Sequence, residues 1–296
     1  MEKNIRIPQA VHSDLKGFQD LLAIVKIYLE VESGTKITLD FHANTWFDAN
    51  LLPVIYSVVE LGRQRDIKSS YSNQHSCKLH KLLIRNGFAK YCFNLEYRPR
   101  PRETVIPFKV FQARDTYEFS TYMDRELMGY FPDMEINVKK AISSYIQELF
   151  GNAQIHGDCT HVYTCGQHYY ENHKMDFTVV NLGKSFAQNV IEYLNETKSV
   201  LPENNIAWAV EPNHSTKRTT TGGIGLSLMR DFINCNHGKF QIVSGNEFWE
   251  LCEGVEKTHT FDGMFPGTIV NIEIDQNDKN IYSYGDNLLS AQELLF

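Results

Sequence analysis

Three polar residues that could do chemistry follow one another at four-residue intervals in the segment ELFGNAQIHG: Glu148, Asn152 and His156. A four-residue step turns only about 40° around an α-helix, so on a helix all three side chains project from one face. A carboxylate can polarise a nucleophile, an amide oxygen can coordinate a hard cation, and an imidazole can face phosphate. Taken alone, the triplet is better explained as a solvated helix face, because polar faces carry such sets by chance.

A second group is rich in glycine. The segment TTTGGIGL places Gly222, Gly223 and Gly225 directly before a helix that is predicted to begin near Leu226. Glycines let the backbone approach a ligand closely, and a helix N-terminus offers unpaired N–H groups to phosphate. Because most glycine loops are only turns, this segment by itself indicates a phosphate site weakly.

Two predicted strand ends also carry polar groups. The strand DFTVVNL ends in Asn181 and is followed by Gly183, and Gly267-Thr268 is predicted to open a C-terminal strand, GTIVNIEI. A polar side chain at a strand end can accept a hydrogen bond from a base, and Thr268 can bridge to one through water. For each glycine by itself, turn chemistry is the simpler explanation.

In this order and spacing, the four motifs resemble the GHKL (Bergerat-fold) ATPases, which include DNA gyrase, sensor histidine kinases, MutL-type repair proteins and anti-sigma-factor serine kinases. The resemblance covers about residues 106–275, and the pattern E-L-x-x-N-A-x-x-H-G is most similar to the anti-sigma-factor kinase branch. It implies a two-layer α/β sandwich that binds ATP and Mg²⁺.

The resemblance also implies a role for each motif. Glu148 takes the place of the catalytic base, Asn152 that of the Mg²⁺ ligand, and His156 lies beside the nucleotide. The segment from Gly222 through Gly223 to Gly225 corresponds to the phosphate-binding segment. No histidine precedes a pair of dimerisation helices of the sensor-kinase type, so histidine autophosphorylation is not expected.

The adenine pocket would be lined by Asn181, Gly183 and Thr268. Lys217 and Arg218 stand in a stretch similar to the lid of the anti-sigma-factor kinases, where they can reach phosphate when the lid closes; a solvated basic loop explains them equally well.

Two positions depart from the family pattern. Asn181 stands where an aspartate usually accepts from the adenine amino group, and Ser185 replaces the second glycine of that motif. Asparagine keeps an acceptor oxygen but loses the charge, so this bond should be weaker. The departures bear on affinity and base selectivity rather than on the fold.

Helices and strands alternate around these motifs, which favours an α/β fold class. Apolar residues at helical spacing predict a helix within residues 11–30, and KITLDF predicts a strand after it. Further helices are predicted to run from about Pro53 to Gly62 and over residues 76–86. Beyond a proline-rich seam, VIPFKVF predicts a strand, and helices are expected over about 115–130 and over 136–156.

The segment ITLDFHANTWFDANLLPVIYSVVELGRQRDI resembles a STAS domain, the fold of anti-sigma-factor antagonists. In signalling members a phosphorylatable serine follows the aspartate at the position of Asp48, but here Ala49 and Asn50 stand there. Neither can accept phosphate. The preferred interpretation of Asp48 and Asn50 is therefore a helix N-cap pair.

These observations predict three regions: a STAS-like α/β domain at 1–103, a GHKL α/β two-layer sandwich at 104–275, and a C-terminal tail at 276–296. The formal net charge of −7 argues against nucleic-acid binding, and no apolar run approaches the ~20 residues of a membrane helix. With no signal-peptide pattern at the N-terminus, a cytoplasmic location is expected.

The stretch from Cys159 to His173 contains cysteines and histidines but is not expected to bind zinc. It is predicted to form two strands joined by ENHK, and strand alternation would send neighbouring side chains to opposite faces.

The expected function is that of an ATP- and Mg²⁺-binding regulatory protein of the anti-sigma-factor-kinase type, with slow ATPase or protein serine kinase activity. The alternative is a catalytically weak, nucleotide-gated interaction module whose STAS-like part docks partners. ATP or ADP and a protein partner are the expected ligands, and a homodimer is left open. A scaffold with an empty site is a more distant alternative.

Overall fold

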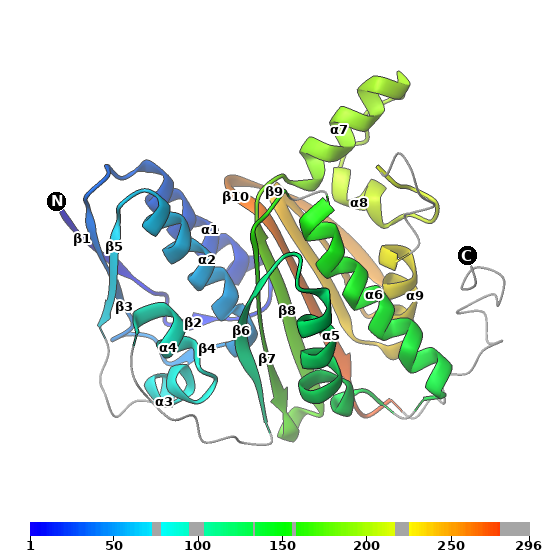
Figure 1. Ribbon diagram of the computed structural model, residues 1–296, viewed down its shortest axis with the longest axis horizontal. Helices are drawn as coiled ribbons and strands as arrows, with labels where there is room; N and C mark the ends of the chain where they lie inside the picture. Colours follow the sequence, from blue (N-terminus) through cyan, green and yellow to red (C-terminus); the bar gives the residue numbers. More distant parts are fainter. Residues whose placement is uncertain (73–77, 95–103, 133, 156–157, 217–224, 279–296) are drawn as a thin grey trace.

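The computed structural model describes residues 1–72, 78–94, 104–132, 134–155, 158–216 and 225–278, of which 78–80 and 155 are described by their backbone alone. This part of the chain is mixed α/β, with one parallel and one antiparallel main sheet (Figure 1). None of its helices combines the length and apolar character needed to cross a membrane.

The N-terminal part places a small parallel sheet beside helices. Strands β1 (Glu2–Arg6), β3 (Lys36–Asp40) and β5 (Lys68–Ser72) pair in the order β1-β3-β5, and β2 (Ala10–Val11) pairs with β4 (Trp46–Phe47). The helices are α1 (Leu15–Glu30), η1 (Ala49–Leu51), α2 (Leu52–Gln64), α3 (Lys78–Arg85) and α4 (Phe88–Phe93).

Local sequence explains why the two long helices of this part begin where they do. The Asp14 carboxylate accepts a hydrogen bond of 2.7 Å from the backbone N–H of Gly17 and so caps α1. Pro53 occupies the first turn of α2, where its missing N–H costs little. The predicted helix within 11–30, the strand KITLDF and the helix beginning at Pro53 are therefore confirmed.

The C-terminal part is built on a five-stranded antiparallel sheet. Its strands are β6 (Val105–Gln112), β7 (His161–Tyr169), β8 (Lys174–Leu182), β9 (Lys239–Cys252) and β10 (Val255–Asp275), in the order β6-β7-β8-β10-β9. A short turn of 3₁₀-helix, η4 (Tyr170–Asn172), joins β7 to β8. The predicted strand VIPFKVF and the predicted pair of strands joined by ENHK are thus confirmed.

Helices cover one face of this sheet, here called the front face. They are α5 (Thr116–Tyr122), which continues as η2 (Met123–Leu127) and η3 (Met128–Tyr130), α6 (Ile136–Ile155) and α9 (Gly225–Asn236), while α7 (Phe186–Thr197) and α8 (Asn205–Val210) lie at one end (Figure 1). The helices expected over 115–130 and 136–156 are present, although the first changes from α- to π- and 3₁₀-helical geometry at Met123.

The last strand is longer than expected. Gly267-Thr268 was predicted to open it, but β10 begins at Val255 and forms a hairpin with β9. The pairing of β9 with β10 shifts register between Thr260 and Phe265 and again between Phe265 and Thr268. The glycine therefore marks an irregularity within the strand rather than its start.

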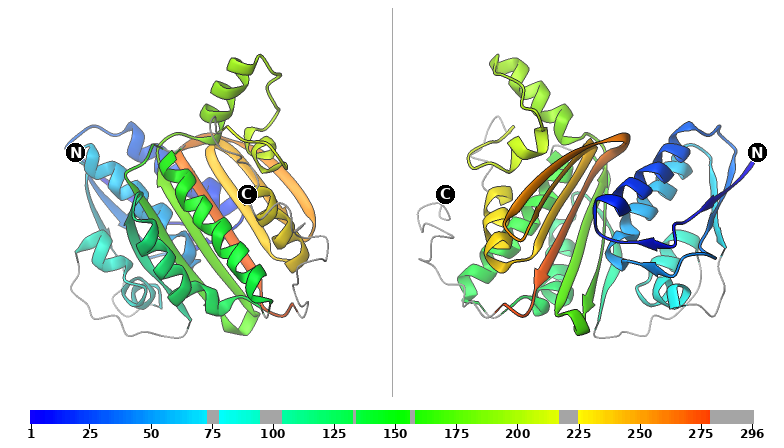
Figure 2. Two further views of the ribbon diagram at one scale, coloured as in Figure 1. Left: turned by 45° about the vertical axis from the view of Figure 1, so that its right-hand side comes forward. Right: turned by 180° about the vertical axis from the view of Figure 1, so that it is seen from behind.

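The opposite face of the sheet, the back face, is buried by α1 and α2 (Figure 2). Apolar side chains of both parts form one hydrophobic cluster there; its members include Phe18, Leu22, Leu51, Ile55, Val180, Val243, Phe248 and Ile269. The segments before and after the proline-rich seam thus share a core, so the N-terminal part is packed onto the sheet rather than tethered beside it.

A row of neutral polar side chains crosses this buried contact. The Asn50 amide, fully buried at 0% exposure, lies 2.8 Å from Asn271 Oδ1, 2.9 Å from Ser13 Oγ and 3.2 Å from Thr178 Oγ1. Asn271 in turn donates to Gln241 Oε1 at 2.9 Å. Buried polar groups need such partners, so this row fixes how η1 and α2 sit on the sheet.

The expected helix-cap role of Asp48 and Asn50 is wrong. Asp48 precedes η1, but its carboxylate makes no capping bond. It instead accepts 2.7 Å hydrogen bonds from the backbone N–H of Ser13 and from Trp46 Nε1, while Asn50 bonds to the sheet. Neither side chain thus bonds to the helix that follows it: Asp48 bonds to Ser13 and Trp46, and Asn50 to distant residues of the sheet.

The next row of the back face is charged. Lys174 and Lys239 approach the Glu273 carboxylate at 2.7 and 3.2 Å, and Glu273 pairs in register with Asp176. Burial opposes ionisation of Glu273, but the two lysines lower its pKa below the ordinary value. Burial, reinforced by the Glu273 charge, holds the pKa of Asp176 well above its ordinary value.

Replacement of Asp176 by asparagine tests this arrangement. A carboxyl whose pKa is higher in the folded than in the unfolded protein stabilises the fold fully below its unfolded pKa, about 3.9, and that stabilisation is lost as the pH rises towards the folded pKa. Asp176→Asn should therefore match the parent near pH 4 and become increasingly more stable than it at pH 6 and 8. Urea denaturation at the three pH values measures this, with exposed Asp262→Asn as the control; parallel pH profiles would contradict the assignment.

Candidate functional site

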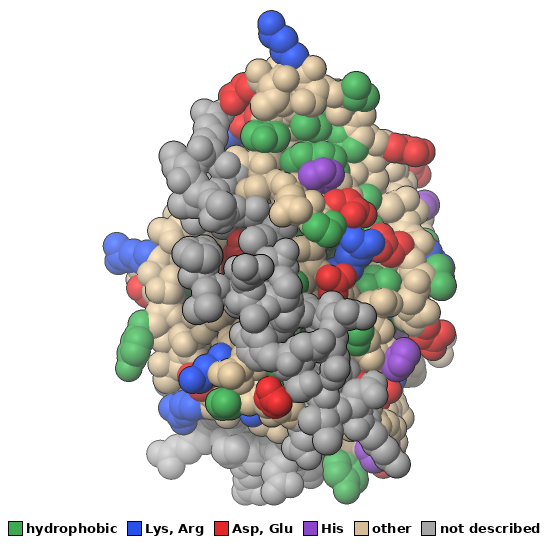
Figure 3. Space-filling model, turned by 90° about the vertical axis from the view of Figure 1, so that its right-hand side faces the viewer, with side chains coloured by type: hydrophobic (Ala, Val, Ile, Leu, Met, Phe, Trp, Pro, Cys, Tyr) green, Lys and Arg blue, Asp and Glu red, His purple; other side chains and the backbone are tan. Residues whose placement is uncertain are grey.

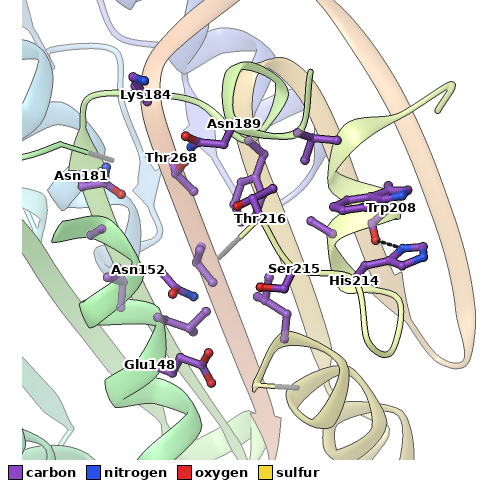
Figure 4. Close-up of a pocket in the computed structure, with 18 residues that line it drawn as sticks. Glu148, Asn152, Asn181, Lys184, Asn189, Trp208, His214, Ser215, Thr216 and Thr268 are labelled. Carbon is purple, nitrogen blue, oxygen red and sulfur yellow. Dashed lines mark hydrogen bonds between the residues drawn. The ribbon is translucent and has the colours of Figure 1, made fainter. Parts of the chain in front are cut away.

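A cavity opens at one end of the front face, between α6, α7, α8 and the sheet (Figure 4). Its polar lining comes from Glu148, Asn152, Asn181, Lys184, Asn189, His214, Ser215, Thr216 and Thr268, and its apolar lining includes Leu149, Val179, Phe186, Val190, Trp208, Leu226 and Val270. The space that water could occupy inside is about 90 Å³.

Helix α6 carries two of the predicted residues into this cavity. Its apolar stripe, which includes Ile146 and Phe150, is buried against the sheet and its neighbours. Glu148 and Asn152 stand beside that stripe, one turn apart, and Figure 4 shows both pointing from α6 into the cavity. The prediction that the two share one side of a helix is confirmed; His156 lies outside the described residues.

The side-chain oxygen of Asn152 accepts no hydrogen bond from the described residues. This atom, Oδ1, is buried. An unsatisfied buried polar atom costs about 1–3 kcal/mol, and each one in a folded protein calls for an explanation such as a bound water or ion. An amide oxygen beside a carboxylate is a donor set that fits Mg²⁺.

Gly225 begins α9 in direct contact with Glu148. A Cβ atom added at this glycine would lie 2.1 Å from Glu148 Oε2, so a larger residue would displace the carboxylate. The first turn of α9 thus lies next to Glu148, and the positive end of a helix dipole favours a negative charge. Gly222, Gly223, Lys217 and Arg218 lie outside the described residues.

The sheet brings Asn181 and Thr268 together. They are partners in register on β8 and β10, and both side chains line the cavity. Ser244 Oγ donates to the Gly267 carbonyl at 2.9 Å and lies 2.7 Å from Thr268 Oγ1. Because the single Ser244 proton is then used, Thr268 donates to Ser244 and its remaining lone pairs can accept from a ligand.

The glycines of these two motifs keep the strands close rather than line the cavity. Gly267 has φ +157°, and a Cβ atom there would lie 2.0 Å from the Asn181 carbonyl oxygen. The backbone N–H of Gly183 donates to the Pro266 carbonyl at 3.0 Å. The predicted adenine-pocket residues are therefore divided: Asn181 and Thr268 face the cavity, and Gly183 supports the chain behind it.

Ser185 has a structural explanation. It is the N-cap of α7: its Oγ accepts from the Gln188 N–H at 3.3 Å, and its own N–H donates to Gln188 Oε1 at 2.8 Å. This reciprocal capping box fixes the start of α7, which forms one wall of the cavity. A glycine at this position would lack the side-chain oxygen that caps α7, so serine defines the start of the helix.

Two ring side chains on the far wall were not anticipated. Trp208 and His214 stack with centroids 4.4 Å apart, and His214 Nδ1 lies 2.7 Å from the Trp208 carbonyl oxygen (Figure 4). A carbonyl can only accept, so Nδ1 carries a proton and donates this bond. In the sequence, the tryptophan in the short apolar segment IAWAV could have indicated an aromatic wall here, and the structure shows it half-buried.

Helix α8, which carries Trp208, is held to the sheet by a buried carboxylate. Glu247 on β9 accepts from the backbone N–H groups of Asn205 and Ile206 at 2.8 and 3.3 Å, and Asn204 caps the helix by accepting from Ala207. The wall of the cavity is therefore anchored at its base, while residues 217–224 lie outside the described part.

The outer surface on this side carries mixed charge. Among the described side chains visible in Figure 3, acidic and basic residues alternate and form no continuous basic surface. Arg230, for example, lies 3.4 Å from Glu211 and donates to Glu256 at 2.7 Å. This distribution does not favour a nucleic-acid backbone.

The cavity offers one carboxylate and one unpartnered amide oxygen as cation ligands. In the described part of the chain, no cluster of three or more His, Cys, Asp or Glu side chains could hold a metal ion. A Mg²⁺ ion bound here would need further oxygens from its ligand or from water, which is how this ion usually binds together with phosphates.

Two glycine substitutions test the contact between α6 and α9. Gly225→Ala must push the Glu148 carboxylate aside, which offsets the stabilisation that alanine otherwise gives a helix, so we expect its unfolding free energy to stay close to that of the parent. Gly151→Ala is the matched control on α6, because its added Cβ meets nothing within 4 Å and alanine favours the helix by about 0.5–1 kcal/mol. Urea denaturation of both variants measures this; equal stability of the two would refute the close contact.

Comparison with known proteins identifies no relative of this chain. No protein-family model matches the chain, and no curated protein matches it significantly. The structure brings four residues of the motifs described above, Glu148, Asn152, Asn181 and Thr268, to one cavity.

Proposed function

We propose that the front-face cavity binds ATP with Mg²⁺, in the manner of a GHKL ATPase of the anti-sigma-factor-kinase type. The observation that carries this proposal is the buried, unpartnered Oδ1 of Asn152 beside Glu148, in a cavity that Asn181 and Thr268 also line. An apolar cavity with a few convergent polar groups is the usual form of a small-molecule site.

The arrangement of the chain supports the same family. An antiparallel sheet with α6 and α9 on one face agrees with the sandwich that the motifs imply, and the order β1-β3-β5 with α1 and α2 agrees with a STAS-like N-terminal part. The two assignments rest on different stretches of sequence, so they support the proposal separately.

Each polar group has a distinct task in this proposal. Asn152 Oδ1 binds the cation, and Glu148 accepts a proton from the attacking water or hydroxyl. Asn181 accepts from the base, and the apolar walls, including Val179 and Val270, exclude water around it. Mg²⁺, when bound, neutralises charge on the phosphates.

The cavity must open to admit a nucleotide. Its 90 Å³ is well below the roughly 300–1,000 Å³ of typical small-molecule sites. The walls formed by α7 and the segment His214–Thr216 are the elements that must move, because α6, the strands and the buried residues of α8 belong to the core. Nucleotide binding is thus coupled to a rearrangement at this end of the molecule.

A nucleotide-gated interaction module with little turnover is the second candidate. It is favoured by the burial of Ala49 and Asn50, which replace the phosphorylatable position of signalling STAS domains and lie inside the shared core at 1% and 0% exposure. These two positions therefore cannot be phosphorylated. The neutral Asn181 in place of an aspartate points the same way, because it weakens the bond to the base.

Calorimetric titration of the full chain with ATP, ADP and GTP, with and without Mg²⁺, tests the proposed site. We expect saturable, adenine-selective binding that Mg²⁺ strengthens and that Asn152→Ala weakens at least tenfold in Mg²⁺. Asn195→Ala, on the exposed face of α7, is the matched control and should bind like the parent. Absence of nucleotide binding by the folded parent, or full binding by Asn152→Ala, would rule out this role of the cavity.

Turnover distinguishes the two candidates. If Glu148 is the general base, Glu148→Gln lowers phosphate release by 10²–10⁴-fold while nucleotide binding persists. We expect a slow but measurable rate in the parent, since Glu148 and Asn152 are both present. A parent rate equal to that of Glu148→Gln, with nucleotide bound, would identify the protein as a gated module without catalysis.

A further inference from the structure

A second and larger cavity lies where the two parts of the chain meet. It holds about 500 Å³ and is lined by Thr45, Trp46, Phe47, Ala49, Lys81, Leu82, Arg85, Gln167 and Tyr169. These residues come from β4, η1, α3 and the end of β7, so neither part could form the cavity alone.

The second cavity lies far from the first along the sheet. Gln167 is five residues along β7 from Val162, the register partner of Asn181, and five strand residues span about 17 Å at 3.3–3.4 Å per residue. The front-face cavity is therefore a separate site.

Two positive charges line this cavity without counter-charges. Lys81 and Arg85 are four residues apart on α3 and so lie on one face of the helix. Neither makes an ion pair or hydrogen bond within the described part of the chain, whereas Arg63 and Arg230 are paired with glutamates. Lys81 is exposed and Arg85 half-buried, so in a protein of net charge −7 they give this cavity a local positive charge that attracts an anion.

Aromatic rings form the opposite side. Trp46 is 48% exposed, yet its ring is fixed because Nε1 donates to Asp48 Oδ1 at 2.7 Å. Burial raises the pKa of Tyr169 far above its ordinary value, so its phenol stays neutral. With Phe47, these rings offer flat apolar surface to a ligand.

The Gln167 side chain is held in place beside the rings. Its Nε2 donates to the His168 carbonyl at 3.1 Å, and its Oε1 is buried. Within the described residues, the cavity thus combines two unpaired cations with flat apolar walls.

We propose that this cavity binds a small organic anion with a planar apolar body, such as an aromatic carboxylate or phosphate monoester. Lys81 and Arg85 bind the anionic group, and Trp46 and Tyr169 contact the planar body. The proposal is independent of nucleotide binding on the front face, because the two cavities share no residue.

The test uses three probes on the full-length protein: 1-naphthyl phosphate, which has both features, 1-naphthol, which has the body alone, and inorganic phosphate, which has the charge alone. Calorimetry gives the affinity, and tryptophan fluorescence should change on binding because Trp46 lines the cavity. We expect one equivalent of 1-naphthyl phosphate to bind at least tenfold more tightly than either partial probe.

Variants locate the binding. Lys81→Met/Arg85→Met removes the charges and keeps apolar stems, so it should weaken 1-naphthyl phosphate at least tenfold. Lys90→Met, an exposed cation on α4, is the matched control and should leave binding unchanged, as should Asn152→Ala in the other cavity. Circular dichroism confirms that each variant is folded.

Three results would overturn the proposal. The first is that the parent binds none of the probes. The second is that 1-naphthyl phosphate binds the double variant as tightly as the parent. The third is that Asn152→Ala abolishes its binding, which would place the probe in the front-face cavity and leave the nucleotide proposal intact.

Discussion

The whole structure depends on burying both faces of one five-stranded sheet. Its front face is covered by α5, α6 and α9, and its back face carries a row of apolar side chains, with Val180, Ile269 and Val243 adjacent across three strands. Without α1 and α2 this row would meet water, at a cost of about 25 cal/mol per Å² of apolar surface. The N-terminal part is therefore a layer of the same core, although prolines separate it from the sheet in the sequence.

Polar rows then specify how that layer sits. Asn50 meets Thr178 and Asn271, and the charged row of Lys239, Glu273 and Asp176 follows one step along the same strands. Apolar contact alone tolerates sliding, but a shift of α2 on the sheet would leave several buried polar groups without partners. Under the proposed function, the segment that resembles a STAS phosphorylation site thus holds the N-terminal part on the sheet and is not a substrate.

Strand alternation allows β8 and β10 to serve two purposes. Asn181 and Thr268 point to the front and line the proposed nucleotide cavity, while Thr178 and Asn271 point to the back and bond to Asn50. A change at the front cavity and the packing of the N-terminal part are therefore connected through the same two strands. The movable wall formed by α7 lies at the end of the sheet farthest from the charged row, so opening there need not disturb the contacts of Asn50.

Features that depend on near neighbours could be predicted from the sequence: the α/β class, the place of Pro53 in the first turn of α2, the long α6, and the position of Glu148 and Asn152 on one side of it. Helical period and capping are local, so a short segment contains the information. Other features came from the tertiary structure: Asn181 lies beside Thr268, β10 begins a dozen residues before the predicted strand, and Asp48 bonds to the distant Ser13 instead of capping a helix. Two sequence regions also share one core, with a second cavity between them. Each of these depends on strand register or on contacts between residues far apart, and no local pattern specifies which distant partner a side chain will find.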